Sequence, residues 1–408
     1  MEYLKPKDGQ LPFAILVFCF LTNLTVLHAS PVPVVRVMVE RENKNILIEG
    51  FDLVFREGVQ GKSVAHVDRR AAVPLSCDAN GKLELRTSLS KKIKITPPLR
   101  VQSLGGFIRI HGRQYRDDLY VYGHRGDCVV VNHVDLEKYV AGLLNSEMSV
   151  SWNLNALKAQ AVAARTYALY QMSLGNPADP TRSPFDLEST VRDQVYEGAH
   201  KERYKALKAV QETRGQILTF KNQPVKAFYH STCGGETENA DRVWGARYPY
   251  LRPVKCGYCN NSPRFQWTYE VSQSELEKKL LAKNLLKGSL KGIRVIERNS
   301  IGRAAFVEVI GSGGKLKVKG TELRDALGSV HLRSTDFRVT ASLRSNSENK
   351  TIRPSMRLGN WVYSFRGSGS GHGVGMCQYG AKGQGDAGKS YAQILRHYYP
   401  LTSIKKIY

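Results

Sequence analysis

Two close pairs of soft metal ligands stand out in the sequence. His230-Ser-Thr-Cys233 places an imidazole and a thiol three residues apart, and Cys256-Gly-Tyr-Cys259 repeats that spacing with two thiols. Thiolate and imidazole donors in two such pairs suit tetrahedral zinc, and four protein ligands leave no open position on the metal. The four residues therefore predict a closed, structural zinc clamp. A disulfide between Cys256 and Cys259 is the alternative, because disulfides persist in oxidising compartments.

The remaining cysteines point to packing and covalent cross-linking. Cys77 and Cys128 could form a disulfide or stay as two unpaired core thiols. We expect Cys377 to be a buried packing residue without a catalytic role, since free cysteine behaves as a small apolar side chain. Cys19 lies in the apolar run at the N-terminus and is expected to be removed with it.

Glu147 is the candidate acid–base residue. It ends an amphipathic pattern, directly before Met148 and five residues before Trp152. A carboxyl group in apolar surroundings has a raised pKa and can donate a proton near neutral pH. An exposed glutamate at a helix end is the alternative, because glutamates are seldom buried. The motifs HExxH, GxSxG, GxGxxG and a phosphate loop are absent, which excludes a common metalloprotease and gives a dinucleotide site no support.

Hydrophobic periodicity predicts the elements that position these residues. Short strands separated by turn residues occupy residues 34–131. Asp135 is the predicted N-cap of a helix that ends near Glu147, and an alanine-rich helix follows over residues 153–169. Further elements are expected as helices over residues 201–213, 274–287, 322–327 and 390–399, with a hairpin over residues 216–230 and strands over residues 293–297 and 305–310.

This arrangement of motifs resembles the SpoIID family, which includes lytic transglycosylases and LytB-type amidase enhancers. The similarity runs from about residue 34 to the end of the chain. The motifs that carry it are residues 132–148 with Trp152, the alanine-rich residues 156–169, Asp193-Gln-Val-Tyr196, Tyr229-His-Ser-Thr-Cys-Gly-Gly235, Leu323-Arg-Asp-Ala-Leu-Gly328, Leu332-Arg-Ser-Thr335 and Gly371-His-Gly-Val-Gly-Met-Cys-Gln-Tyr-Gly-Ala381.

The resemblance implies an α+β fold in which antiparallel sheets and packed helices form a substrate groove between lobes. We expect five parts along the chain. These are a signal peptide (1–30), a β-rich N-terminal part (31–131), a helical catalytic core with the zinc clamp (132–264), an α/β insert lobe (265–353) and a Gly-rich C-terminal core segment (354–408).

The resemblance also implies an activity: cleavage of the bond between N-acetylmuramic acid and N-acetylglucosamine in peptidoglycan, with 1,6-anhydro ends and Glu147 as the acid. The preferred glycan in the family is stripped of its stem peptides. A lytic transglycosylase needs one carboxylate, because the sugar supplies the attacking hydroxyl, whereas a hydrolase needs two. No obvious partner lies near Glu147, although the more distant Asp193 could act as one.

Several other residues are candidates for substrate contact, with solvated or purely structural roles as the alternatives. His230 and Cys233 match a metal-proximal stretch found in some family members. The candidates for substrate binding are Lys158, Gln160, Arg165, Tyr167, His372 and Gln378.

Composition and the N-terminus place the protein outside the cytoplasm. The 408 residues include 60 Lys and Arg against 36 Asp and Glu, a net charge of +24 that attracts polyanions. Lys5 and Lys7, an apolar run over residues 11–21 and Ala29-Ser30 predict a cleaved secretory signal, with an uncleaved anchor as the alternative. We therefore expect a protein of the periplasm or cell envelope, with no nucleic-acid partner and no stable transmembrane segment after cleavage.

Three functions remain open at this point. The first is the lytic transglycosylase, acting on peptidoglycan glycan strands. The second is a non-enzymatic amidase enhancer, whose partner is an N-acetylmuramoyl-L-alanine amidase. The third is a zinc-stabilised module that only binds the cell wall.

Overall fold

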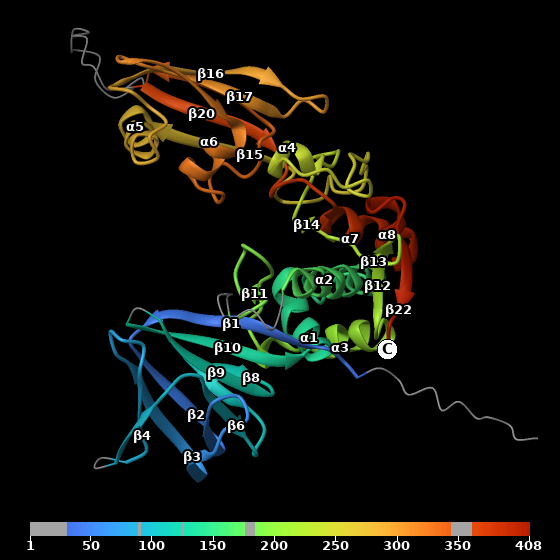
Figure 1. Ribbon diagram of the computed structural model, residues 1–408. Coiled ribbons are helices and arrows are strands. Elements are labelled where there is room, and N and C mark those ends of the chain that lie inside the picture. The colour runs from blue at the N-terminus through green and yellow to red at the C-terminus, as the bar shows by residue number, and fades with distance from the viewer. Residues whose placement is uncertain (1–30, 89–90, 125, 176–183, 344–360) are drawn as a thin grey trace, which may run out of the picture. The chain divides into compact units, whose positions relative to one another are not determined.

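The protein is described by a computed structural model that covers residues 31–88, 91–124, 126–175, 184–343 and 361–408 (Figure 1). The expected signal peptide lies outside these residues. Residues 32–408 form one compact unit that mixes sheets and helices, so the predicted α+β class is confirmed. No helix in the described parts of the chain is long and apolar enough to cross a membrane.

An eleven-stranded sheet forms most of the N-terminal part of the described chain. Its strand order is β11-β1-β10-β9-β6-β2-β3-β4-β5, with β7 paired to β2 and β8 paired to β7. All pairings are antiparallel except that of β1 with β11. The strands are β1 (Val34–Asn43), β2 (Asn45–Glu57), β3 (Ser63–Cys77), β4 (Leu83–Arg86), β5 (Lys92–Ile95), β6 (Leu99–Ser103), β7 (Ile108–Ile110), β8 (Arg113–Tyr115), β9 (Asp118–His124), β10 (Asp127–Asp135) and β11 (Leu187–Glu188).

A disulfide joins two strands that are not neighbours in this sheet. Cys77 at the end of β3 and Cys128 near the start of β10 are bonded, with their Cα atoms 5.5 Å apart. Of the two states left open by the sequence, the structure therefore has the cross-linked one. The bond closes a loop with a sequence separation of 51 residues.

Helix α1 (Leu136–Glu147) follows β10 without a loop. The Asp135 carboxylate accepts hydrogen bonds from the backbone N–H groups of Glu137 and Lys138, so the predicted N-cap is confirmed. The residues from Tyr139 to Leu144 are all buried, so the core covers the helix on most of its surface. Its end delivers Glu147 to the surface of that core.

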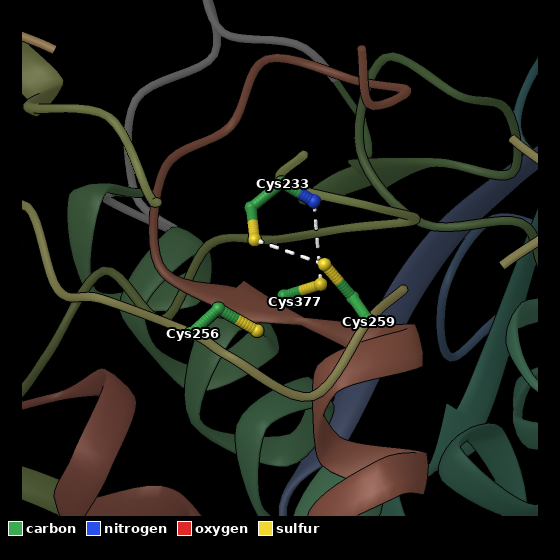
Figure 2. Close-up of side chains that lie close together, drawn as sticks. All are labelled: Cys233, Cys256, Cys259 and Cys377. Atoms are coloured by element: carbon green, nitrogen blue, oxygen red, sulfur yellow. Dashed lines mark hydrogen bonds between the residues drawn. The ribbon is translucent and has the colours of Figure 1, made fainter. Parts of the chain in front are cut away.

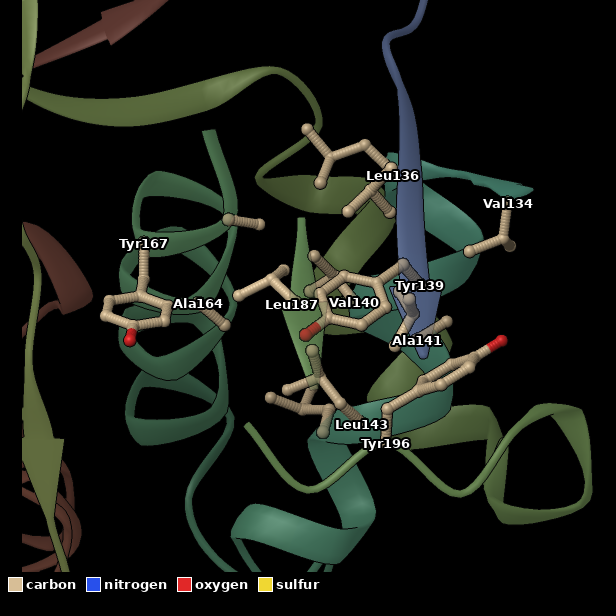
Figure 3. Packing of buried hydrophobic residues seen from close by; sticks show 14 of the residues in the cluster. Val134, Leu136, Tyr139, Val140, Ala141, Leu143, Ala164, Tyr167, Leu187 and Tyr196 are labelled. Atoms are coloured by element: carbon tan, nitrogen blue, oxygen red, sulfur yellow. The ribbon is translucent and has the colours of Figure 1, made fainter. Parts of the chain in front are cut away.

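Helix α2 (Leu154–Leu174) begins at the N-cap Asn153. Its alanines are fully buried, which lets α1, α7 (Gln378–Asp386) and α8 (Tyr391–Tyr398) approach its backbone closely. Figure 3 shows Ala164 of α2 on the side of the helix that faces Tyr139, Val140 and Leu143 of α1. The helix extends one turn beyond the predicted end at residue 169.

The rest of the core consists of short elements around α2. A three-stranded sheet has the order β13-β12-β22, and β14 pairs with β21 in parallel. The strands are β12 (Gln216–Phe220), β13 (Gln223–Pro224), β14 (Tyr229–His230), β21 (Met376–Cys377) and β22 (Ser403–Lys406). The helices are η1 (Ala199–Lys201), α3 (Tyr204–Glu212), α4 (Ala240–Trp244), α7 (Gln378–Asp386) and α8 (Tyr391–Tyr398).

The insert lobe has a hydrophobic core of its own, which runs in sequence from Trp267 to Phe365. Its sheets have the orders β15-β20-β19 and β16-β17-β18. The strand β20 lies in the middle of the first sheet, although the sequence assigned it to the C-terminal segment. The elements are β15 (Gln266–Ser272), α5 (Gln273–Leu281), β16 (Leu290–Arg298), β17 (Ala304–Gly311), β18 (Gly314–Lys319), α6 (Gly320–Leu327), β19 (Phe337–Leu343) and β20 (Trp361–Ser368).

Candidate active site

Glu147 lines a cavity of about 1010 Å³. The end of α1 supplies the glutamate, β14 and the segment after β21 supply one wall, and residues around α6 of the lobe supply another. Glu147 is half-buried rather than exposed. The carboxyl group therefore sits where an extended ligand can reach it while protein covers part of its surface.

Three donors surround the Glu147 carboxyl group. The backbone N–H of Val195 donates to Oε1 at 2.8 Å, and the amide of Gln378 donates to Oε2 at 3.3 Å. Burial raises the pKa of Glu147, while Val195, Gln378 and the Tyr229 hydroxyl act in the opposite direction because they stabilise the charged form. Burial is the stronger effect, so the group holds its proton to higher pH than an ordinary glutamate.

A buried hydrogen-bond chain orients the Tyr229 hydroxyl. Tyr139 donates to Oε1 of Gln194 at 2.9 Å, and Nε2 of Gln194 donates to the Tyr229 oxygen at 3.1 Å. Because Gln194 occupies an acceptor position of that hydroxyl, the Tyr229 proton is free to point to Glu147. The chain thus fixes a donor beside the carboxyl group.

Two other carboxylates line the cavity, and both are engaged. Oδ1 of Asp193 accepts from the Tyr167 hydroxyl at 2.8 Å, and its Oδ2 accepts from the backbone N–H of Glu188 at 2.9 Å. Asp325 is largely exposed and forms an ion pair with Lys283 at 3.1 Å. Glu147 is therefore the acid of this cavity that combines partial burial with a raised pKa.

Aromatic rings and arginines complete the walls. Trp152 and Tyr379 meet edge to face, and Phe228 and Trp244 stack with ring centres 4.2 Å apart. Trp244 is 46% exposed, so a ligand can reach its ring. Four arginines carry the positive charge of the lining: Arg192, Arg264, Arg324 and Arg333. The cavity thus combines exposed aromatic surface with positive charge.

Three of the predicted substrate contacts line this cavity: Tyr167, His372 and Gln378. His372 is held by backbone on both nitrogens, since Nδ1 accepts from the N–H of Val374 and Nε2 donates to the carbonyl of Tyr229. Burial lowers the pKa of His372 to about 4, so its ring is neutral at neutral pH. Contact of these three side chains with a glycan stays a prediction.

The prediction that Arg165 faces the cleft is corrected by the structure. Arg165 is fully buried, and its guanidinium donates to both carboxylate oxygens of Glu137, at 2.9 and 2.7 Å. Lys158 forms an ion pair with Glu212 on α3, and Gln160 is fully buried within α2. Neither lies among the residues that line the cavity. The polar face of α2 therefore serves helix packing.

The predicted metal ligands fall into a cluster with a different composition. The Sγ atoms of Cys233, Cys256, Cys259 and Cys377 all lie within 4.8 Å of one another (Figure 2). His230 is not part of this cluster, and its Nδ1 is hydrogen-bonded to the carbonyl of Val374. The ligand set is thus corrected: Cys377 takes the place of His230. Cys377 is buried as predicted, but its role is more than packing.

The geometry and the surroundings of the four thiols fit a tetrahedral metal ion. Cys233 and Cys259 have their sulfur atoms 3.5 Å apart, close to the ~3.8 Å edge of a tetrahedron with zinc–sulfur bonds of ~2.3 Å. The four thiols are free and buried, so the disulfide between Cys256 and Cys259 is not formed here. Backbone N–H groups of Cys233 and Gly380 both donate to Sγ of Cys377 at 3.3 Å, which stabilises a thiolate.

The Gly-rich segment brings the cluster and the cavity together by close backbone packing. Gly375 has φ of 74°, and a Cβ atom there would lie 2.0 Å from the carbonyl oxygen of Phe228. Only glycine fits that position. The segment therefore runs tightly along β14, which places Cys377 in the cluster and the next residue, Gln378, against Glu147.

Sequence reasoning missed Tyr229 and Val195 as partners of Glu147. Tyr229 stands directly before the predicted ligand His230, and Val195 lies inside the Asp193–Tyr196 motif. Both residues lie in motifs of the family, which could have indicated that they belong to the site. The local sequence pattern does not show which way a side chain or an N–H group points. Arg324 and Arg333 of the lobe wall also lie in quoted motifs, Leu323–Gly328 and Leu332–Thr335, but the motifs do not show that these arginines face the cavity.

Two regions of the chain match known protein families, and several known proteins are similar to most of the chain. Residues 124–220 match the SpoIID family, described as stage II sporulation protein, and residues 240–375 match a domain family of unknown function. A stage II sporulation protein D of Bacillus subtilis is 33% identical over 68% of this chain and 76% of its own length. An uncharacterised protein of Brachyspira hyodysenteriae is 35% identical, over 71% and 72%. An amidase enhancer of Bacillus subtilis is 31% identical, over 64% of this chain and 40% of its own length.

Proposed function

Because the chain belongs to the SpoIID family, we propose that it is a peptidoglycan lytic transglycosylase. It cleaves the bond between N-acetylmuramic acid and N-acetylglucosamine and leaves a 1,6-anhydro end on the muramic acid. The observation that carries this proposal is the Glu147 carboxyl group, half-buried at the wall of a cavity of about 1010 Å³ with a raised pKa.

In the proposed reaction one carboxyl group moves one proton twice. Protonated Glu147 gives its proton to the glycosidic oxygen as the bond from that oxygen to C1 of muramic acid breaks. The resulting carboxylate takes the proton of the C6 hydroxyl as O6 bonds to C1. Water is neither consumed nor released, and Glu147 ends protonated as it began.

The surroundings of Glu147 fit both halves of this cycle. Burial favours the protonated acid, and the donors Val195, Tyr229 and Gln378 limit the cost of the carboxylate that forms next. A hydrolase needs a second carboxylate to activate water or to attack C1. Asp193 is the half-buried candidate for that role, and protein donors already occupy both of its oxygens. The lack of a free second carboxylate among the described residues of the cavity lining supports transglycosylation over hydrolysis.

The arginines support a glycan stripped of its stem peptides as substrate. Removal of a stem peptide leaves a free carboxylate on the muramic acid. Arg324 and Arg333 on the lobe wall of the cavity can pair with such a group, and arginine suits carboxylates through its two parallel N–H donors. The exposed ring of Trp244 offers an apolar surface to the sugar.

The cysteine cluster supports a structural role for zinc. Four thiolates, from Cys233, Cys256, Cys259 and Cys377, would hold the ion and leave no site on it for substrate. When bound, zinc would cross-link the segments before and after the lobe. Its contribution is then to keep Tyr229 and Gln378 in place beside Glu147.

A cell-envelope location and glycan partners complete the proposal. The high net charge and the expected signal peptide both suit an exported protein that meets an acidic wall polymer. The disulfide between Cys77 and Cys128 suits an oxidising compartment.

Product analysis on purified glycan strands without stem peptides tests the activity. Wild-type protein should release anhydro-muramic ends in water enriched in heavy oxygen without incorporating that isotope. Glu147→Gln should lower the rate by about 10² or more, the typical contribution of a general acid–base group. Glu270→Gln is the matched control, because Glu270 is exposed and is not among the residues that line the cavity. Labelled reducing ends would show hydrolysis and contradict the proposal.

The amidase enhancer is the second candidate function, and the similarity to an enhancer favours it. An enhancer binds an N-acetylmuramoyl-L-alanine amidase or its glycan and releases no anhydro ends itself. Stimulation of a purified amidase by wild type and by Glu147→Gln alike would support this function. A protein that only binds the wall should sediment with sacculi and neither stimulate the amidase nor release soluble fragments.

A further inference from the structure

A second cavity of about 740 Å³ lies within the insert lobe. It shares no lining residue with the cavity of Glu147. Strands β15, β16, β19 and β20 supply its walls, and three of its side chains are arginines: Arg298, Arg338 and Arg366. Asp336 is the one acidic side chain of the lining, so these four residues carry a net charge of +2.

Two of the arginines face each other across neighbouring strands. Arg338 of β19 and Arg366 of β20 are directly opposite in the antiparallel register, and both side chains are exposed. Like charges in this position destabilise a sheet. Within the described ranges no carboxylate forms an ion pair with either arginine. Asp336 interacts favourably with Arg338 but carries one charge against two, so part of the repulsion between the two arginines remains.

The third arginine is held in place by backbone carbonyls. Arg298 donates from Nη1 to the carbonyl of Gly302 at 2.7 Å and from Nη2 to that of Phe337 at 2.9 Å. Neutral carbonyls orient the guanidinium without cancelling its charge. A fixed cation therefore lies beside the exposed pair, which is the arrangement of a preorganised anion site.

We propose that this lobe cavity binds an oxyanion, a phosphate or carboxylate group carried by an anionic cell-wall polymer. Guanidinium groups bind such groups through parallel N–H donors, and several of them can share one oxyanion. An anion between Arg338 and Arg366 converts their mutual repulsion into two attractions. The oxyanion chemistry follows from the arginines alone, whereas the polymer class rests on the proposed function.

The position of the cavity suits a polymer that also enters the catalytic cavity. Thr335 lines the cavity of Glu147, and the next residue, Asp336, lines the lobe cavity. The linings of the two cavities therefore meet at consecutive residues of this segment. A polymer longer than the lobe cavity would be held by the same lobe that supplies a wall of the Glu147 cavity.

Binding and thermal-shift measurements on the full chain test the site. The probes are inorganic phosphate, a glycerol-phosphate oligomer, glycan strands without stem peptides and an uncharged N-acetylglucosamine oligomer, all at one ionic strength. Phosphate should raise the melting temperature of the wild type but not that of Arg338→Gln/Arg366→Gln. We expect this double variant to bind the charged oligomers at least tenfold more weakly. Without ligand it should melt no lower than wild type, since the repulsion is gone.

The matched control is Lys291→Gln/Lys315→Gln, which removes the same charge from exposed lobe residues outside the cavity. It should bind like wild type. Preference for the phosphodiester or for the carboxylate polymer identifies the source of the oxyanion. Equal weakening by both double variants, or equal binding of the uncharged oligomer, would overturn the proposal. Glu147→Gln should bind normally, so a failed activity test leaves this result interpretable.

Discussion

Gln378 donates its side-chain amide to Oε2 of Glu147 across 3.3 Å, although 231 residues separate the two in the chain. Cys377, directly before Gln378, belongs to the sulfur cluster. Tyr229, the other side-chain donor to Glu147, stands in β14, which pairs with the strand that contains Cys377. The acid is therefore surrounded by residues that the cysteine cluster holds in position.

Removal of the Tyr229 hydroxyl should shift the pH dependence of the reaction. The hydroxyl stabilises the Glu147 carboxylate, so Tyr229→Phe raises the pKa of Glu147 further. The acid then stays protonated to higher pH, and the alkaline limb of kcat/KM moves up by about one pH unit, the equivalent of one charge-assisted hydrogen bond. Tyr204→Phe, at an exposed position, should leave the profile unchanged. A limb that moves down or stays in place would contradict this role.

Metal content should depend on Cys377 and not on His230. Purified wild-type protein is expected to contain about one zinc per chain. Cys377→Ser removes one of four thiolates, so the protein should lose its zinc to a mild chelator and melt at a lower temperature. His230→Gln should retain zinc, because His230 contacts the carbonyl of Val374 and lies outside the cluster. Circular dichroism of both variants shows whether the fold is kept, and equal zinc loss by both would return His230 to the ligand set.

Local signals predicted the elements of the core well. Asp135, Asn153 and Ser390 cap the helices as their side chains suggest, because capping depends on residues within one turn. The end of α5 was predicted too late, since apolar spacing continues through Leu285 and Leu286. The helix ends before them, and Asn284 follows with a left-handed φ of 57° that asparagine tolerates.

Long-range partners were beyond the reach of these signals. Arg165 lies two helical turns from Lys158, so its spacing allowed it to face the cleft. Only the fold shows that it is buried and paired with Glu137 on α1. Cys377 lies far along the chain from the other three cysteines, in a segment whose own pattern indicates tight backbone packing. Ligand-spacing patterns detect only ligands that are close in sequence. They therefore indicate His230 as the fourth ligand, in the place that Cys377 takes in the structure. Glu147 was found through its motif, and its cavity required the structure.

The buried pair of Arg165 and Glu137 should be a major source of stability. Arg165→Met leaves the Glu137 carboxylate buried without its main partner and should lower the free energy of unfolding by about 3–5 kcal/mol. Arg165→Met/Glu137→Gln should recover much of this, because no charge is left unpaired. Urea unfolding of the three proteins measures the difference. A substrate-binding role would instead raise KM and leave stability unchanged.

The same pair predicts acid sensitivity. Burial alone would raise the pKa of Glu137, but hydrogen bonds from Arg165, Tyr408 and Gly215 outweigh it and lower the pKa. A carboxyl group whose pKa is lowered in the folded state stabilises the fold at any pH above its pKa in the unfolded chain. That contribution is lost as the pH falls through the lowered pKa of the folded state. Stability measured from neutral to acidic pH should therefore fall less steeply in the double variant than in wild type.

The Cys77–Cys128 disulfide should stabilise the N-terminal sheet independently of the active site. Cys77→Ala/Cys128→Ala frees a loop with a sequence separation of 51 residues and should lower the free energy of unfolding by about 2–5 kcal/mol. Zinc content and kcat should stay near wild type, because neither cysteine lies near the cluster or the cavity lining. Urea unfolding, metal analysis and the glycan assay test this together. Unchanged stability would show that the two thiols are not bonded in the protein as isolated, and loss of zinc would show that the sheet and the cluster are coupled.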